Sequence, residues 1–459
     1  MKKLFIYSLS ALAALSFTAC VNEEDDLFDE SPAERLITIQ RETKATLVDA
    51  PNGWYMQYFT INEEPGYNYL MRFDKTGAVK IAGNNSWIGG TYKEEESLFD
   101  MLADNGPVLS FSTYNKIFHI FADPADVPET PNSILNEQGY GHKGDYEFII
   151  NKVTPDRIEL EGKKWGKKII MTPIPEGVDW QEFITGLDAR KNKLFNPKVP
   201  VYIMSTPKGN FYLTHADGGF FYIVRTDGDP VVDTQYMPFV VGTDGMRLGY
   251  AFAGHNPQDL AADEKMAILN FKDAEDGSLV CTDEGQEAVI TTPSAAELLS
   301  RSYDIMTLVF DENNRIQKPV MSKVSSEFSV DLKSLTGEVA AKLTAMHESI
   351  MAFQKGERQI RELTFRYDGA GNQLVMKLRT NKYTSNYYLN AEVVDGKLKL
   401  ENKNKGDKNG NTFLSKCPGI KDFLDYLASA PIEVTFAAPL GSYEATAKLA
   451  DGSAFELSL

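Results

Sequence analysis

The sequence has little cysteine, little histidine, no excess of positive charge and no long apolar run. Only three of its 459 residues are cysteine and five are histidine, which excludes a disulfide-held scaffold and leaves few of the sulfur and nitrogen ligands that zinc prefers. Asp and Glu number 65 against 47 Lys and Arg, a net charge of −18. An acidic chain lacks the cationic surface that neutralises phosphates. We therefore expect no nucleic-acid partner.

Motifs of catalysis, cofactor binding and metal binding are also missing. The histidines show no H-x-x-x-H, H-E-x-x-H or H-x-H spacing, and no G-x-S-x-G nucleophile motif occurs. The glycine-rich residues 139–144 continue into Asp145, where a phosphate-binding loop has Lys followed by Ser or Thr. We predict no catalytic residue, no metal and no cofactor. A hydrolase whose site is assembled from distant carboxylates stays open, because 65 acidic residues allow many pairs.

The N-terminus has the pattern of an export signal. Lys2 and Lys3 precede a short apolar stretch over residues 4–15, too short to span a bilayer. Phe17-Thr18-Ala19-Cys20 follows, and this arrangement looks like a bacterial lipobox. We predict a signal peptide over residues 1–19 and lipidation of Cys20, which would attach the chain to a membrane. The alternative is an ordinary secretory signal that ends near a cysteine.

An acidic segment follows Cys20. Its charges are Glu23, Glu24, Asp25, Asp26, Asp29 and Glu30. Like charges at this density repel one another and keep a chain extended. We interpret residues 20–30 as a lipidated acidic tether, similar to the surface-export signal of Bacteroidetes lipoproteins. A solvated spacer without a sorting role is the alternative.

The rest of the chain has the composition of a folded protein with two or three domains. It is 42% hydrophobic, and its 34 glycines and 21 prolines are ordinary numbers for this length. Residues 31–48 have a capping signal and helical periodicity, and residues 54–171 change to the alternation of short strands. Expected strands are 67–73, 78–81, 98–102, 107–112, 117–121, 146–150, 158–161 and 169–171.

Residues 31–196 are therefore predicted to form one domain. It has an N-terminal helix, an antiparallel meander closed as a barrel or strongly curved, and a helix over 179–194. Asn196-Pro197-Lys198-Val199-Pro200 marks a boundary. Residues 197–459 form a second β-rich region, with two subdomains at about 197–330 and 331–459 as one arrangement. It carries one long amphipathic helix over 337–354 and a short helix at 420–428. The predicted class is mainly β with a few helices (α+β).

Four aromatic residues are the candidate ligand contacts. They are Trp87, Trp165, Tyr383 and Tyr387. Flat aromatic faces bind sugars and apolar ligands, but most large aromatic side chains belong to cores. Trp165 lies among four lysines, where a solvated turn and a contact to an acidic glycan are the two alternatives. Cys281 and Cys417 are either a disulfide or two buried thiols.

Several stretches together resemble a family of Bacteroidetes lipoproteins defined only as a domain of unknown function. They are residues 50–54, 67–73, 106–115, 144–148 and 162–173. The resemblance runs over most of the mature chain and is most specific over residues 31–190. It implies a lipoprotein of the outer membrane exposed at the cell surface, in a family often associated with transporters of the starch-utilisation type. The family has no established catalytic residues.

These observations predict a cell-envelope lipoprotein, anchored in the outer membrane through Cys20. The leading hypothesis is a non-enzymatic accessory protein of nutrient capture that binds a glycan, a peptide or an outer-membrane transporter or receptor. The alternatives are the hydrolase with distant carboxylates and a structural or adhesive surface protein.

Overall fold

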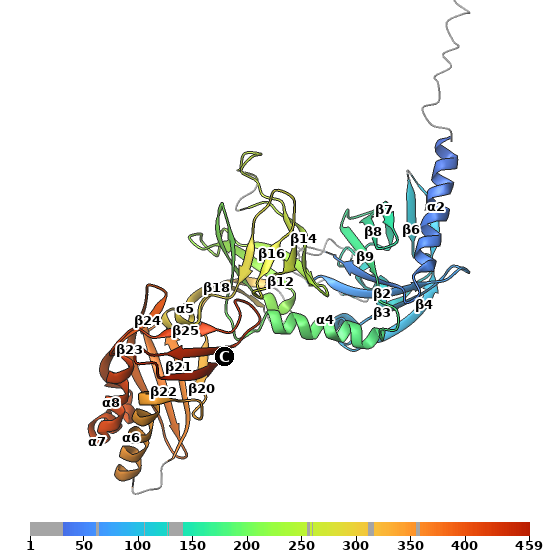
Figure 1. Ribbon diagram of the computed structural model, residues 1–459. Coiled ribbons are helices and arrows are strands. Elements are labelled where there is room, and N and C mark those ends of the chain that lie inside the picture. The colour runs from blue at the N-terminus through green and yellow to red at the C-terminus, as the bar shows by residue number, and fades with distance from the viewer. Residues whose placement is uncertain are drawn as a thin grey trace, which may run out of the picture.

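The computed structural model describes residues 31–60, 64–104, 106–125, 127, 141–254, 258, 260–310, 316–354 and 359–459. The predicted signal peptide, Cys20 and the acidic tether lie outside these ranges. The described chain is mostly β with a few helices, which confirms the predicted fold class. Three β-rich units lie one after another along an elongated molecule (Figure 1). In the described ranges, no helix has the length and apolar character needed to cross a membrane.

The first unit is a helix followed by a curled nine-stranded antiparallel sheet. Helix α2 (Pro32–Asp49) begins with a capping box between Ser31 and Glu34. The strand order is β4-β3-β2-β1-β9-β8-β7-β6-β5. The strands are β1 (Trp54–Tyr58), β2 (Tyr67–Phe73), β3 (Ala78–Gly83), β4 (Lys93–Leu98), β5 (Asp100–Ala103), β6 (Pro107–Ser110), β7 (Glu147–Thr154), β8 (Arg157–Gly162) and β9 (Lys168–Pro173).

Hydrogen bonds at Leu98 show how far this sheet curls. The Ser112 N–H donates to the Leu98 carbonyl at 3.1 Å, and the Leu98 N–H donates to Thr113 Oγ1 at 2.7 Å. These contacts bring the end of β4 to the segment that follows β6, near the opposite edge of the sheet. The strongly curved sheet predicted from the short alternating strands is confirmed.

Two local predictions in this unit are wrong. Residues 117–121, expected as a strand, belong to helix α3 (Lys116–His119) and the 3₁₀ turn η2 (Ile120–Ala122). Asn115 starts that helix, because its Oδ1 accepts the N–H groups of Ile117 and Phe118 at 3.0 and 3.1 Å. The expected strand 98–102 is instead parts of β4 and β5, which are separated by the buried Phe99.

The second unit is a closed barrel of eight antiparallel strands, reached through helix α4 (Trp180–Leu194). Asp179 caps α4, whose apolar stripe packs on the first sheet. The barrel strands are β10 (Tyr202–Thr206), β11 (Gly209–Thr214), β12 (Phe220–Arg225), β13 (Gln235–Val241), β14 (Gly245–Phe252), β15 (Ile268–Asp273), β16 (Leu279–Cys281) and β17 (Val289–Thr291). Closure removes the exposed sheet edges.

The first unit packs directly on the barrel through Phe59 and Gly66. Phe59 is 2% exposed. A Cβ on Gly66 would lie 2.5 Å from Val240 Cγ1 and 2.6 Å from the Phe59 ring, so only glycine permits this approach. Because the contact is close-packed on both sides, it fixes the position of β1 relative to β13 and β14.

The third unit is a second curled sheet with helices packed on it. Its order is β24-β23-β22-β21-β20-β27-β26-β25, and a single bridge between Leu398 and Ile432 brings the two edges together. A two-stranded ribbon, β18 (Tyr303–Phe310) and β19 (Ile316–Val324), precedes it. The sheet strands are β20 (Glu327–Val330), β21 (Ile360–Asp368), β22 (Gln373–Thr380), β23 (Thr384–Val394), β24 (Lys397–Gly406), β25 (Glu433–Phe436), β26 (Glu444–Lys448) and β27 (Ala454–Ser458).

Four helices accompany this sheet: α5 (Ala295–Ser300), α6 (Gly337–Phe353), α7 (Lys408–Lys416) and α8 (Pro418–Leu427). Helices α6, α7 and α8 lie together at one side of the unit (Figure 1). The structure confirms the helices predicted around 337–354 and 420–428. Helix α7 is not among the predicted helices; the Asp407 side chain caps it by accepting the Gly410 N–H at 2.7 Å.

Candidate functional site

Trp87 is a half-buried side chain of the first unit that contacts the His142 ring and the Glu64 carboxylate. It occupies the 3₁₀ turn η1 (Ser86–Ile88), and its ring meets the edge of the His142 ring at 4.7 Å between centroids. Trp87 Nε1 donates to Glu64 at 3.4 Å. His142 Nδ1 lies 2.8 Å from the same carboxylate, without the alignment of a hydrogen bond. Both rings are therefore held by protein neighbours.

Trp165 contacts residues that lie next to His142 in the chain. Lys143 and Lys164 place their ammonium groups 5.2 and 4.8 Å from the centre of its ring. The buried carboxylate of Asp145 accepts the N–H groups of Lys164 and Trp165 at 2.9 and 3.1 Å. Burial raises the pKa of Asp145, although these two hydrogen bonds oppose the shift. Residues 142–145 thus contact both tryptophans singled out in the sequence.

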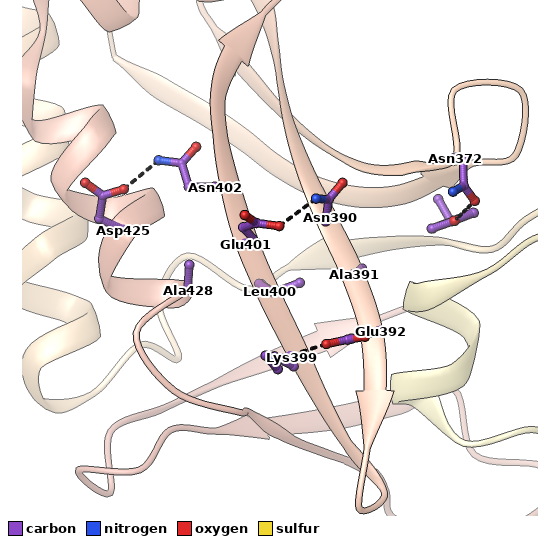
Figure 2. Close-up of a pocket in the computed structure, with 11 residues that line it drawn as sticks. Asn372, Asn390, Ala391, Glu392, Lys399, Leu400, Glu401, Asn402, Asp425 and Ala428 are labelled. Atoms are coloured by element: carbon purple, nitrogen blue, oxygen red, sulfur yellow. Dashed lines mark hydrogen bonds and ion pairs between the residues drawn. The ribbon is translucent and has the colours of Figure 1, made fainter.

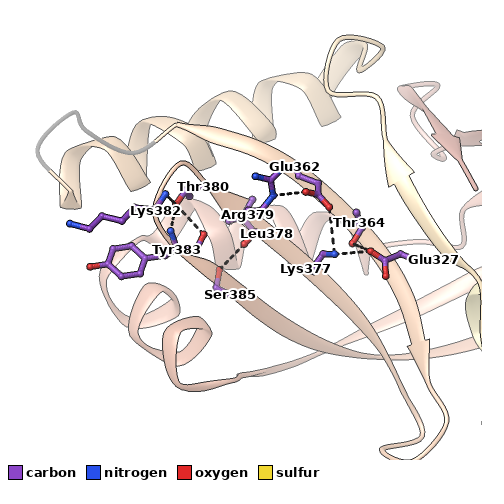
Figure 3. A network of polar contacts seen from close by, with 10 residues as sticks. All are labelled: Glu327, Glu362, Thr364, Lys377, Leu378, Arg379, Thr380, Lys382, Tyr383 and Ser385. Carbon is purple, nitrogen blue, oxygen red and sulfur yellow. Dashed lines mark hydrogen bonds and ion pairs between the residues drawn. The ribbon is translucent and has the colours of Figure 1, made fainter.

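Tyr383 and Tyr387 lie far from these tryptophans, in the third unit. Tyr387 is 0% exposed, and its hydroxyl pairs with Ser385 Oγ at 3.0 Å. A ligand cannot reach this ring, so the prediction that Tyr387 contacts ligand is wrong; it belongs to the core behind β23. Tyr383 is 38% exposed, at the turn between β22 and β23 beside Lys382 (Figure 3).

The surface next to Tyr383 is a ladder of ion pairs across β20, β21 and β22 (Figure 3). Lys377 Nζ lies 2.7 Å from Glu327 and 3.5 Å from Glu362, and Arg379 Nε lies 2.5 Å from Glu362. Each charge has an opposite partner on a neighbouring strand. Such cross-strand pairs support the sheet and engage these four charges with one another.

The two cysteines of the described chain are free, buried thiols. Cys281 lies in the barrel core and Cys417 in the core of the third unit. A disulfide between them is therefore not formed, because they belong to separate units. Burial raises the pKa of each thiol to about 11.

A polar groove of about 890 Å³ lies along β23, β24 and the end of α8 (Figure 2). Its polar side chains are paired with one another. Glu401 accepts from Asn390 at 2.7 Å, and Lys399 donates to Glu392 at 2.8 Å. Asn402 donates to Asp425 at 2.7 Å. The groove thus offers surface to a ligand but few unused hydrogen-bonding groups.

A second cleft, of about 700 Å³, lies between the first sheet and the barrel. We call it the interunit cleft. One wall comes from β1, β9 and the β7–β8 turn, and the other from the β13–β14 turn, β14 and β15. Its polar and charged lining includes Gln57, Asp156, Arg157, Thr172, Asp244, Arg247, Asn270 and Lys272.

Arg247 is the buried cation of this cleft. The residue is 4% exposed, and its Nη2 donates to the Lys168 carbonyl at 3.1 Å. The guanidinium carbon lies 5.3 Å from the centre of the Phe59 ring. Nε and Nη1 have no hydrogen-bond partner among the described residues, and neither has Gln57 Oε1 on the facing wall. Burial, followed by the nearby charge of Arg157, lowers the pKa of Arg247 to about 10.

The sequence alone did not identify Arg247. It lies in a strand of alternating apolar residues, where an arginine is expected to face water. Here the outward face of β14 is covered by the first unit, so its side chain is buried between the two units. The described residues contain no cluster of three His, Cys, Asp or Glu side chains suited to hold a metal ion.

Comparison with known proteins gives one family and weak structural likenesses. The model of the family described as Domain of unknown function (DUF4302) matches residues 24–259. Two structures of the vaccine antigen transferrin binding protein B from Haemophilus parasuis Hp5, a single and a double mutant, align with 88% of this chain and 74% of theirs. Their identities are 8% and 9%, with TM-scores of 0.12 and 0.13, too low to support any inference. The search of curated proteins finds no significant match.

Proposed function

The chain belongs to the family described as Domain of unknown function (DUF4302), and from that premise we propose that it is a non-enzymatic binding protein of the bacterial cell surface. In this proposal a lipid on Cys20 holds it in the outer membrane, and the interunit cleft takes the ligand. Its role is accessory to nutrient capture, with a glycan or a peptide passed to an outer-membrane transporter or receptor.

The interunit cleft is the observation that carries the binding role. Its walls are strands of two β units whose contact is close-packed at Phe59 and Gly66. Clefts between rigid units that combine apolar surface with a few polar groups are common ligand sites. Arg247 and Gln57 line the cleft and carry buried polar atoms that have no hydrogen-bond partner among the described residues. In the groove along β23 and β24, by contrast, the polar groups pair with one another.

Asp425 is one acidic residue of the larger groove whose surroundings do not fit the general acid of a hydrolase. Burial alone would raise its pKa, but the hydrogen bonds from Lys421 and Asn402 hold that pKa below its usual value. A general acid of a glycosidase needs a raised pKa so that it holds its proton at neutral pH. Asp425 is therefore poorly suited to protonate a leaving group.

The proposed site is tested by filling the cleft. Thr172 lines it from β9 and is half-buried, so Thr172→Trp places an indole where a ligand would lie. Thr446→Trp is the matched control, since Thr446 is also half-buried on a strand but lies in the third unit. Glycan and peptide arrays probed with the full chain should show binding by the wild type and by the control and none by Thr172→Trp. Equal binding by all three proteins would remove the cleft from the proposal.

The anchor and the partner need separate measurements. Cells fed a labelled fatty acid should incorporate the label into the wild type and not into Cys20→Ala; label in both would refute the anchor. Mild crosslinking in the native outer membrane, followed by purification and mass spectrometry, should recover a transporter or receptor with the lipidated protein. Recovery of this protein alone would remove the accessory role and leave an independent binder.

A further inference from the structure

We propose that the interunit cleft selects ligands that carry a carboxylate, and that Arg247 is the positioning cation. The inference rests on the proposed binding function and adds the chemical class of the ligand. The shared chemistry is a carboxylate on a short chain, which an acidic oligosaccharide or an acidic peptide can provide.

The first argument is that the Arg247 guanidinium has no ion-pair partner in the part of the chain that the structure describes. No carboxylate forms an ion pair with it among the described residues, and its one hydrogen bond goes to a neutral carbonyl, that of Lys168. Burying a charge without a partner is strongly unfavourable. Because the side chain lines the cleft, an anion placed there would offset part of that cost.

The second argument comes from Arg190, another arginine that joins the same two units. Arg190 Nε donates to the Gly242 carbonyl at 2.9 Å, and its Nη2 lies 2.5 Å from Asp273 Oδ1. This is the arrangement expected of an arginine that only ties two units together. Arg247 lies at the same junction but has no ion-paired carboxylate among the described residues. A role in joining the two units therefore does not explain why a charged side chain is buried there.

The other charged groups near Arg247 have protein partners or are exposed, although Glu159 and Asp283 act on its charge from a distance. Arg157 is paired with Glu159 at 2.8 Å. Asp283 accepts three hydrogen bonds from Leu269 and Asn270, which occupy its oxygens. The remaining charged lining residues, Asp156, Asp244 and Lys272, are exposed. Exposed charges are screened by water and salt, whereas a buried one acts through a low dielectric.

A carboxylate is the anion we favour because its two oxygens match the planar donors of a guanidinium. The unpartnered Gln57 Oε1 on the facing wall would then accept from a hydroxyl or amide N–H of the same ligand. A volume of about 700 Å³ suits a short oligomer rather than a single small ion. Both sugars and peptides carry the required donors.

The test uses two pairs of probes on the purified full chain, measured by titration calorimetry. Trigalacturonate is compared with neutral galactotriose, and an Asp-containing tetrapeptide with its amidated Asn analogue. We expect the charged member of at least one pair to bind at least tenfold more tightly than its neutral partner. That preference should become smaller as the salt concentration rises, because the interaction between the guanidinium and the carboxylate is electrostatic.

Three variants assign the preference to Arg247. Arg247→Met should abolish it, Arg247→Lys should retain part of it, and Arg379→Met, at an exposed ion pair of the third unit, should leave it unchanged. Replacement of an uncompensated buried charge by an apolar side chain of similar length is often neutral or stabilising. We therefore expect the melting temperature of Arg247→Met to equal or exceed that of the wild type.

The outcomes separate this inference from the proposed function. Equal binding of the charged and neutral probes overturns the carboxylate inference and leaves a binding protein. A charge preference that persists in Arg247→Met also overturns it. If none of the four probes binds at millimolar concentration, the proposed binding of glycans or peptides is refuted together with it. A preference lost in Arg247→Met and partly kept in Arg247→Lys supports both.

Discussion

Replacement of Phe59 by Ala should loosen the contact that forms the interunit cleft. The ring is 2% exposed and lies against the Arg247 guanidinium at 5.3 Å. A Cβ added to Gly66 or Gly249 would lie within 3.0 Å of this ring. Both units are thus in van der Waals contact with one side chain, and its loss leaves a cavity between them.

The expected cost follows from the size of that cavity. Truncation of a fully buried Phe to Ala costs about 3–5 kcal/mol in the free energy of unfolding. The lost cation–π contact adds about 1 kcal/mol. Water that enters the cavity can hydrate the unpartnered Nε and Nη1 of Arg247, which lowers the total. We expect a net loss of about 3–4 kcal/mol.

Tryptophan fluorescence during urea unfolding is a selective assay. All four tryptophans, Trp54, Trp87, Trp165 and Trp180, precede the barrel in the sequence. With a urea dependence of about 2 kcal/mol per molar, the midpoint of the fluorescence transition should fall by about 1.5–2 M. Phe413→Ala, in the core of the third unit, is the control and should leave this transition in place. A shift below about 0.5 M for Phe59→Ala would refute the reasoning.

Three further predictions concern other side chains of the protein. Because burial raises the pKa of Cys281 and Cys417 to about 11, a thiol reagent at pH 8 should label neither in the native protein and both in denaturant; rapid native labelling would contradict their burial. Hydrogen bonds from Ser453 and Tyr426 lower the pKa of Asp451 from 3.8 to about 2, so its contribution to stability is present above pH 3.8 and is lost as the pH falls toward 2. Acid unfolding of Asp451→Asn should show a smaller dependence on pH in that window, and an unchanged profile would argue against the assignment. Lys377→Met removes the centre of an exposed ion-pair ladder and should cost about 1 kcal/mol or less in chemical denaturation, because water screens such pairs; a loss above about 2 kcal/mol would show that the ladder is more than a surface feature.

Much of the fold could be predicted from the sequence because local signals agree with it. Helix α2 has its capping box, and α6 has an apolar stripe at helical spacing. Strands such as β2 and β22 alternate buried and exposed side chains over part of their length. The strand predicted over residues 117–121 was wrong because a short apolar run fits a strand or a buried helix equally well. Only the capping side chain of Asn115 distinguishes the helix from the strand there.

The candidate site could not be predicted in the same way. The rings of Trp87 and Trp165 are half-buried and that of Tyr387 is buried. The sequence does not show this difference, because it does not reveal which face of a strand other elements cover. Arg247 is a candidate only because the first unit covers β14. That burial depends on the approach of Phe59 and Gly66 to the barrel, a long-range contact with no local signature.

Hydrogen–deuterium exchange of the full chain with and without saturating carboxylate probe tests the central claim most directly. Exchange should slow around residues 168–175 on the first unit and 242–247 on the barrel, the two walls of the interunit cleft. Slowed exchange confined to residues 390–402, along the groove of the third unit, would contradict the account and place the binding site there instead.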